Sequence, residues 1–312
     1  MIVCLAANPS VDKLFEVERI VLGGIHRPDG FVQVAGGKGL NAVRTVHALG
    51  AKATAVALLR GHTGRWLEDM LGVEGVSVRA VWTHGENRSS LSVADRETGG
   101  LTEFYEHGAD VPSAAWAELL HAVESTWTPG GWLTISGSTP VGAPDHGYRD
   151  LVRDARVEGV RVALDAEGER LRLALEAHPE VVKVNASEAS GLLGVPTSRR
   201  DDALAAAGKL RDLAGADGHA GVVTRGAEGV VLAAPDGSFY EGRLYVRGRY
   251  PVGSGDAFLA GFVTALDRGD DWEGALRLGL GAATANAELP GAGTLDPARA
   301  AVLAAQAEVR RA

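Results

Sequence analysis

The sequence of 312 residues is long enough for one large domain or two modest ones, each with a substantial core. Apolar residues make up 46% and charged residues 23%, which is typical of a globular chain and excludes a disordered one. The 40 acidic residues outnumber the 31 basic ones and no Lys/Arg run is present, so we expect no nucleic acid and no membrane as partner.

The first residues, MIVCLAANPSVD, carry no basic leader, and Asp12 ends their apolar run too early for a signal peptide. No apolar run approaches the roughly 18 residues of a membrane span. Cys4 is the only cysteine, which excludes an internal disulfide and a cysteine zinc site. We therefore expect a cytoplasmic protein.

Short runs rich in Val, Ile and Leu alternate with helical patterns along the chain. The predicted strands are 2–6, 54–59, 132–136, 160–165, 181–184 and 221–224. The predicted helices include 40–49, 114–123, 145–157 and 201–213. Unbroken apolar strands that alternate with helices indicate a mainly parallel sheet covered on both faces. The predicted fold class is α/β.

Two stretches interrupt this rhythm. Residues 15–20 and 31–34 alternate apolar with polar side chains, and residues 88–106 have the pattern of a hairpin with a glycine turn. This alternation of side chains indicates a small sheet with one solvent-exposed face and one buried face. We predict one domain over 1–312, with a lid inserted from about 12–35 and 88–107.

The stretch YPVGSGDAFLAGF, residues 250–262, places Asp256 behind two glycines at the start of an apolar helix. One interpretation is structural, because Asp is a favoured N-cap. The other is functional: Gly253 and Gly255 let a ligand approach the backbone, and a helix start aims free NH groups and the positive end of its dipole at an anion. A carboxylate beside such a cradle could take a proton from a hydroxyl that attacks bound phosphorus.

Two further stretches allow two interpretations each. AGGKGLNAVRTVHALGA, from Ala35, is either a second anion cradle with Lys38 or a tight turn with a solvated lysine. It lacks the P-loop spacing, and the first strand leads into NPSVD rather than GxGxxG, which argues against a dinucleotide-binding dehydrogenase. In KVNASE, Asn185 and Glu188 either form a capping box or anchor a magnesium-water cluster on nucleotide phosphates.

In chain order, NPSVD, GGKGLN, ISGS, KVNASE, VTRGAEG and VGSGDAFLAGF resemble the motifs of the ribokinase-like, or PfkB, carbohydrate kinases, from Ile2 to about Leu295. The resemblance is strongest to the branch of 1-phosphofructokinase, tagatose-6-phosphate kinase and the minor bacterial 6-phosphofructokinase. It implies a three-layer α/β/α sandwich with a small β-sheet lid, and transfer of the γ-phosphoryl group of ATP, with Mg²⁺, to a hydroxyl of a phosphosugar.

The leading substrate is fructose 1-phosphate, with tagatose 6-phosphate and fructose 6-phosphate as alternatives. Ile25 occupies the position of a substrate-contacting lysine in the minor 6-phosphofructokinase, which disfavours that assignment. A sugar-phosphate sensor of the same fold, without turnover, is a more distant alternative.

The resemblance also implies residue roles. Asp256 would be the general base, and the backbone of Gly253, Ser254 and Gly255 the anion hole. The substrate-binding residues would be Asp12, Gly37, Lys38, Asn41, Arg88 and Ser138. Lys38 and Arg88 would receive the phosphate of the substrate. The nucleotide-binding residues would be Lys183, Asn185, Thr224, Gly226, Gly229 and Asn286, and Glu188 would hold Mg²⁺ through water. A homodimer through the lid is also implied.

Overall fold

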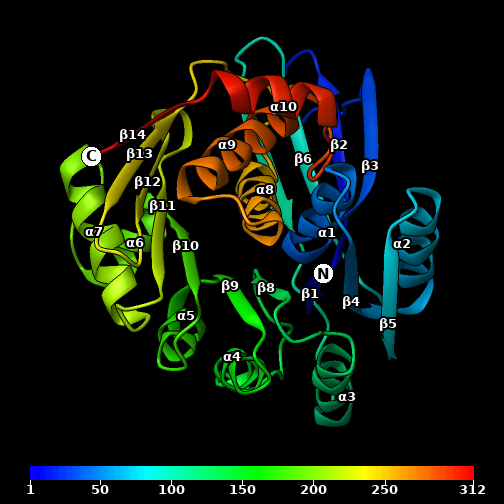
Figure 1. Cartoon of the computed structure of the whole chain (residues 1–312). Coiled ribbons are helices and arrows are strands. Elements are labelled where there is room, and N and C mark those ends of the chain that lie inside the picture. The colour runs from blue at the N-terminus through cyan, green and yellow to red at the C-terminus, as the bar shows by residue number, and fades with distance from the viewer.

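A computed structural model describes residues 1–312, and two β-sheets organise it (Figure 1). The large sheet has the strand order β14-β13-β12-β11-β10-β9-β8-β1-β4-β5, and the small sheet has the order β3-β2-β6-β7. The strands from β11 to β5 in this order are parallel, whereas β12, β13 and β14 pair antiparallel. The predicted α/β class with a mainly parallel sheet is confirmed.

All the predicted strands of the large sheet are present. Its strands are β1 (Ile2–Ala6), β4 (Ala53–Arg60), β5 (Ser77–Thr83), β8 (Trp132–Ser136), β9 (Arg161–Asp165), β10 (Val181–Asn185), β11 (Ala220–Thr224), β12 (Val230–Ala233), β13 (Phe239–Arg243) and β14 (Glu308–Arg311). The sequence pattern did not predict β5 or the antiparallel strands β12 to β14.

The helices cover both faces of the large sheet. They are α1 (Lys38–Ala48), α2 (Gly61–Val73), α3 (Ser113–Glu124), α4 (Gly147–Val157), α5 (Gly168–Leu175), α6 (Ala186–Leu193), α7 (Arg200–Leu213), α8 (Ser254–Arg268), α9 (Trp272–Glu288) and α10 (Pro297–Gln306). The predicted helices correspond to α1, α3, α4 and α7 within about two residues at each end. None of the helices is long and apolar enough to cross a membrane.

Two hydrophobic cores lie on opposite faces of the sheet. One contains side chains of α1, α2, α8, α9 and α10, and the other contains side chains of α3 to α7. Alternate residues of β1 divide between them: Ile2 and Cys4 pack into the first core, Val3 and Leu5 into the second. The apolar runs are unbroken because both faces of these strands are buried.

Close packing fixes α8 between the sheet and α9. Gly261 of α8 lies so near α9 that a Cβ there would stand 2.8 Å from the carbonyl oxygen of Leu278. Gly281 of α9 approaches α10 in the same way, with 2.4 Å from its ideal Cβ to the carbonyl oxygen of Ala300. Distances below 3 Å leave no room for a side chain, so glycine at these positions lets the three helices form one rigid layer.

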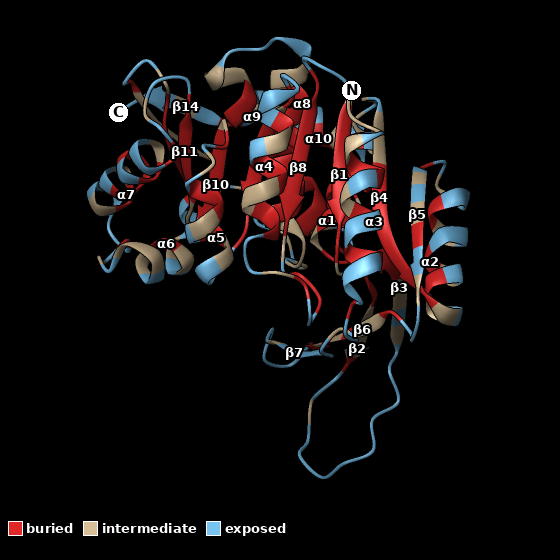
Figure 2. Ribbon diagram, turned by 90° about the horizontal axis from the view of Figure 1, so that it is seen from below, coloured by how far each residue is buried: buried red, intermediate tan, exposed pale blue.

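The small sheet contains β2 (Ser10–Val17), β3 (Gly30–Gly36), β6 (Arg88–Asp95) and β7 (Leu101–Tyr105). Figure 2 shows it beyond one end of the strands of the large sheet, with a long exposed loop between β2 and β3. The predicted hairpin is formed by β6 and β7. The strands β2 and β6, which are far apart in sequence, pair in parallel. The chain therefore builds this sheet from two separate insertions.

Candidate active site

A cavity of about 950 Å³ lies where the carboxyl ends of the central strands meet the small sheet. All but one of the residues predicted from the sequence line this cavity. They are Asp12, Gly37, Lys38, Asn41, Arg88, Ser138, Lys183, Asn185, Glu188, Thr224, Gly226, Gly229, Gly253, Ser254, Gly255 and Asp256. The exception is Asn286.

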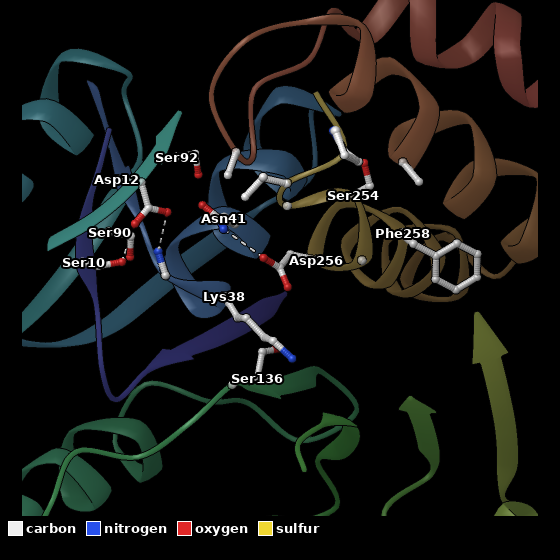
Figure 3. Close-up of a pocket in the computed structure, with 18 of the residues that line it drawn as sticks. Ser10, Asp12, Lys38, Asn41, Ser90, Ser92, Ser136, Ser254, Asp256 and Phe258 are labelled. Carbon is white, nitrogen blue, oxygen red and sulfur yellow. Dashed lines mark hydrogen bonds between the residues drawn. The ribbon is translucent and has the colours of Figure 1, made fainter. Parts of the chain in front are cut away.

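Asp256 is the third residue of α8 and does not cap it. The N-cap is Gly253, which adopts φ 78° and gives no side-chain hydrogen bond. The structural interpretation of Asp256 as an N-cap is therefore wrong, because the helix begins two residues earlier. Its Oδ2 instead accepts a hydrogen bond from Nδ2 of Asn41 at 2.8 Å, as Figure 3 shows.

The environment of Asp256 raises the proton affinity of its carboxylate. Burial raises the pKa of Asp256 to about 6, because removal from water disfavours the charged form. The ammonium group of Lys38 opposes this rise, the carboxylate of Asp165 adds to it, and the Asn41 hydrogen bond and Lys183 oppose it. A carboxylate with such a pKa is ionised at neutral pH and still able to accept a proton.

The glycine cradle before Asp256 is held from behind by Asn286. The side chain of Asn286 donates to the carbonyl of Val252 at 2.9 Å and to the hydroxyl of Ser254 at 3.2 Å, and accepts from the amide of Gly293 at 2.8 Å. Asn286 has no exposed surface, since its relative accessibility is 0%. It thus positions the cradle, and the structure does not place it at an adenine pocket.

Two lysines share one buried carboxylate beside Asp256. Lys38 Nζ lies 3.0 Å from Oδ1 of Asp165, and Lys183 Nζ lies 2.6 Å from Oδ2. The ammonium group of Lys183 also lies 3.1 Å from the ideal Cβ position of Gly255, which brings it to the start of α8. The cradle, the base and two cations thus meet at one end of the cavity.

Charge pairing sets the ionisation of this cluster. Burial lowers the pKa of Lys38, but the carboxylates of Asp165, Asp256 and Glu188 outweigh it and raise the pKa above its ordinary value. Burial raises the pKa of Asp165, but Lys183 and Lys38 outweigh it and hold that pKa below its ordinary value. Sequence reasoning missed Asp165, whose only signal is its position at the end of a predicted strand.

Asp12, on β2 of the small sheet, lines the side of the cavity that this sheet covers, which we call the lid side. Its carboxylate accepts hydrogen bonds from the hydroxyl of Ser10 at 2.5 Å and from the amide of Gly37 at 3.2 Å. Burial raises the pKa of Asp12, and these hydrogen bonds oppose the rise. The side chain is thereby fixed against the start of α1, in a position to accept a ligand hydroxyl.

Arg88 is the cation on the lid side. It donates from Nε to the carbonyl of Asn8 at 3.3 Å and from Nη1 to the hydroxyl of Ser90 at 3.4 Å. Asn8 in turn donates to the hydroxyl of Ser138 at 3.2 Å. Sequence reasoning named Arg88 and Ser138 but missed Asn8, which lies in the NPSVD motif, and Ser90, which pairs with Asp12 across β2 and β6.

The capping box of KVNASE is present. The Asn185 side chain accepts from the amide of Glu188 at 2.9 Å, and Oε2 of Glu188 accepts from the amide of Asn185 at 2.7 Å. Oε1 of Glu188 lies 3.9 Å from Lys38 Nζ and is free of the capping box. The structural interpretation is confirmed, and both residues also line the cavity.

The turn after β11 lines the cavity with two glycines, Gly226 and Gly229. Thr224 ends β11, and Gly226 adopts a positive φ of 55° in the turn that follows. A Cβ at Gly229 would stand 2.2 Å from the carbonyl oxygen of Gly242, so only glycine fits there. This turn leaves backbone rather than bulky side chains at the cavity wall.

Three buried polar atoms on the cavity wall have no hydrogen-bond partner in the protein. They are Oδ1 of Asn41, Oγ of Ser136 and Oγ1 of Thr139. Buried polar groups are nearly always hydrogen-bonded, so water or a bound polar ligand supplies the partners of these atoms. A base, an anion cradle, paired cations and free polar atoms together suit phosphoryl transfer to a hydroxyl.

Known proteins resemble this chain over nearly its whole length. The model described as pfkB family carbohydrate kinase matches residues 6–299. The 1-phosphofructokinase of Haloferax volcanii is 31% identical over 299 residues, which cover 95% of this chain and 93% of that protein. The tagatose-6-phosphate kinase of Staphylococcus epidermidis is 28% identical over 269 residues, or 85% of each chain. The solved structure of Escherichia coli phosphofructokinase-2 with substrates and products is 28% identical, covers 97% of this chain and 98% of that chain, and has a TM-score of 0.90.

Asp256→Asn should stabilise the folded protein at neutral pH. The folded-state pKa of about 6 exceeds the ordinary 3.8, so the charged carboxylate lowers the free energy of unfolding by about 3 kcal/mol. This gain in the free energy of unfolding should have its full size above about pH 7. It should vanish as the pH falls through 6 towards 4, because Asp256 in the native wild-type protein takes up a proton at a higher pH than Asp256 in the unfolded chain. Urea unfolding from about pH 5 to pH 8 measures it.

Asp271→Asn is the matched control. Asp271 is an exposed N-cap of α9 whose side chain accepts from the amide of Gly274, and Asn caps equally well. That variant should change the free energy of unfolding by no more than about 0.5 kcal/mol. An Asp256→Asn protein less stable than the wild type above about pH 7 would contradict the raised pKa.

Proposed function

The chain belongs to the pfkB family of carbohydrate kinases, and from this we propose that it is an ATP-dependent 1-phosphofructokinase that converts fructose 1-phosphate into fructose 1,6-bisphosphate. As a member of the family it is a phosphotransferase with an alcohol group as acceptor. The observation that carries the proposal is the buried Asp256 carboxylate, which lies beside a glycine cradle and two lysine ammonium groups.

Asp256 acts as the general base of the transfer. As the sugar hydroxyl oxygen bonds to the γ-phosphorus, its proton passes to the Asp256 carboxylate. The bond from the γ-phosphorus to the bridging oxygen breaks at the same time, and ADP leaves with that electron pair. Asn41 keeps the carboxylate oriented through its 2.8 Å hydrogen bond, so the base need not reorganise during the reaction.

Charge on the transferring phosphoryl group is stabilised at the start of α8. The backbone NH groups of residues 253–255 lie at the positive end of the helix dipole. Lys183 and Lys38 bring positive charge to the same place through Asp165. Preorganised donors of this kind supply the largest share of many rate enhancements.

A phosphosugar fits the lid side better than a plain sugar. Arg88 and Asp12 lie on adjacent strands there, and Arg88 Nη2 makes no hydrogen bond to the protein, so that it can bind a substrate phosphate. Lys38 was expected to share this task, but its ion pair with Asp165 assigns it to the transferring phosphoryl group in our proposal. Asp12, Asn41 and the backbone of Gly37 bind sugar hydroxyls.

The choice of fructose 1-phosphate follows the relatives named 1-phosphofructokinase, from Haloferax volcanii and Bacillus subtilis. The relative named tagatose-6-phosphate kinase and the neighbour named phosphofructokinase-2 support tagatose 6-phosphate and fructose 6-phosphate as alternatives. These substrates differ in where the phosphate lies relative to the attacking hydroxyl, and one arginine on the lid does not distinguish them.

ATP would lie along the turn of Thr224, Gly226 and Gly229 with its phosphates towards Lys183 and Asn185. Oε1 of Glu188 suits Mg²⁺ held through water, because it is a carboxylate oxygen on the cavity wall without a hydrogen bond in the protein. The ion would neutralise charge on the nucleotide phosphates. Because ATP and phosphosugars are cytoplasmic metabolites, we also propose a cytoplasmic location.

The lid sheet supports a homodimer. Its outer face carries two apolar cross-strand pairs, Phe15 with Phe31 and Leu91 with Phe104, beside the polar pair of Lys13 and Gln33. The rings of Phe15 and Phe31 are 5.4 Å apart, and Phe31 and Phe104 are 57% and 60% exposed. Exposed apolar side chains that gather on one face mark an interaction site, and a second copy of the chain would bury these. A solved form of Escherichia coli phosphofructokinase-2 is tetrameric.

Fructose 1-phosphate should be the best acceptor in an ADP-release assay with ATP and Mg²⁺. The panel also contains fructose 6-phosphate, tagatose 6-phosphate, fructose and ribose. We expect the kcat/KM for fructose 1-phosphate to exceed that for each of these compounds by more than about tenfold, which corresponds to about 1.4 kcal/mol in transition-state binding. A plain sugar as best acceptor would overturn the phosphate site at Arg88, and binding of phosphosugars without turnover would favour the sensor alternative.

Asp256→Asn should lower kcat by about a thousandfold and change the affinities for ATP and phosphosugar by less than about threefold. The wild-type kcat/KM should fall on the acid side with a midpoint near pH 6, because protonated Asp256 cannot accept the hydroxyl proton. Asp271→Asn, at the start of α9, should keep wild-type turnover. Unchanged turnover in Asp256→Asn would refute the general base.

The wild-type protein should sediment at twice the chain mass of 32.4 kDa. Phe104→Glu should shift it to the monomer, because the new charge would have to be desolvated in the interface. Val302→Glu, at a half-exposed position of α10, is the control and should leave the dimer intact. A wild-type monomer at micromolar concentration, or a Phe104→Glu dimer of unchanged stability, would reject the lid interface.

A further inference from the structure

Asp165 is the only charged side chain of the protein with no exposed surface, at 0% relative accessibility. It ends β9, and its backbone carbonyl accepts from the amide of Gly137 at 2.8 Å. Each carboxylate oxygen contacts a different lysine, at 3.0 Å for Lys38 and 2.6 Å for Lys183. The three side chains come from β9, α1 and β10, so the cluster joins three separate elements.

We propose that Asp165 is a positioning residue, which holds the ammonium groups of Lys38 and Lys183 at the phosphate end of the cavity and keeps them from pairing with Asp256. The proposal rests on the kinase function above and adds to it a residue that controls two cations at once. Asp165 itself does not touch the reacting atoms, since the two lysines and the wall of the cavity cover it.

Repulsion between the lysines makes a common anion necessary. Two ammonium groups within 3.0 Å of one carboxylate repel each other strongly in a buried site, and the carboxylate offsets this repulsion. The side chain of Lys183 is only 4% exposed, whereas that of Lys38 is 36% exposed, so water stabilises the charge of Lys183 less than that of Lys38. Without Asp165, Lys183 would be a buried charge without a partner, which is strongly unfavourable.

Asp256 is the other anion that a released lysine could reach. The charged groups that face it are Lys38 of α1, Asp165 of β9 and Lys183 of β10, and Glu188 of α6 faces Lys38 in turn. A lysine paired with Asp256 would lower the pKa of that carboxylate and occupy the oxygen that must accept the proton. Asp165 prevents this because it binds both lysines itself.

Asp165→Asn tests the proposal, since Asn keeps the shape but offers a single acceptor oxygen and no charge. We expect the dissociation constant for ATP, measured by calorimetry, to rise at least about tenfold, and the KM for the phosphosugar to change less than about threefold. The acid midpoint of kcat/KM should move down by about half a pH unit or more, because the loss of one anion and the release of a lysine both lower the pKa of Asp256.

Glu167→Gln is the matched control. Glu167 is exposed on the wall of the same cavity, two residues beyond Asp165, and forms no ion pair. Its substitution removes one negative charge without touching either lysine. The shift of the acid midpoint should therefore be less than half of that in Asp165→Asn. Equal shifts in the two variants would show that any nearby charge suffices and would overturn the proposal.

An Asp165→Asn protein with unchanged ATP affinity and acid midpoint would also overturn it, whatever its kcat. If that variant does not fold, Asp165→Asn with Lys183→Met removes both charges of the shorter ion pair and should fold. Its ATP affinity should then be lower than that of Lys183→Met alone, because Lys38 also loses its anchor, and equal affinities in these two variants would overturn the proposal. ATP binding needs no acceptor, so these results stand even if no phosphosugar is turned over, which would refute the proposed function alone.

Discussion

Two buried carboxylates and two lysines share one small volume, and their charge balance determines how the rest of the site is built. Both oxygens of Asp165 bind lysines, which holds its pKa below the ordinary value. Asp256 receives only the hydrogen bond of Asn41, and burial raises its pKa to about 6. One carboxylate is thus a permanent anion and the other a proton acceptor. The two environments push the pKa values of Asp165 and Asp256 apart, and in this way one site gives different roles to two residues of the same type.

The fold makes this balance possible because it brings distant segments together at one edge of the sheet. Asn41 and Asp256 are 215 residues apart in sequence, and Lys38 and Asp165 are 127 apart. Parallel strands end at the same edge, so β9 and β10 deliver Asp165 and Lys183 side by side. Helices α1 and α8 begin at that edge and pack against each other on one face of the sheet. The small sheet then covers the cavity from the opposite side.

The sequence predicted the layers and most of the cavity wall, because apolar runs and glycine turns are local signals. It did not predict contacts that depend on three-dimensional pairing. Asp256 has the pattern of a cap, yet α8 begins at Ser254 because Gly253 supplies the left-handed conformation. Asn286 was expected at a ligand and instead holds the cradle. Asp165 belongs to no motif, so only the approach of Lys38 and Lys183 identifies it.

The position of Cys4 decides how this protein responds to oxidants and thiol reagents. Cys4 lies in β1 and packs into the first core with no exposed surface, and burial raises its pKa to about 12, which disfavours the reactive thiolate at neutral pH. The residues that line the cavity include no cysteine and no methionine. We therefore expect thiol reagents to leave the folded protein unmodified. A single cysteine introduced on the small sheet would be the sole reactive thiol, so a fluorophore could be attached there without first replacing Cys4.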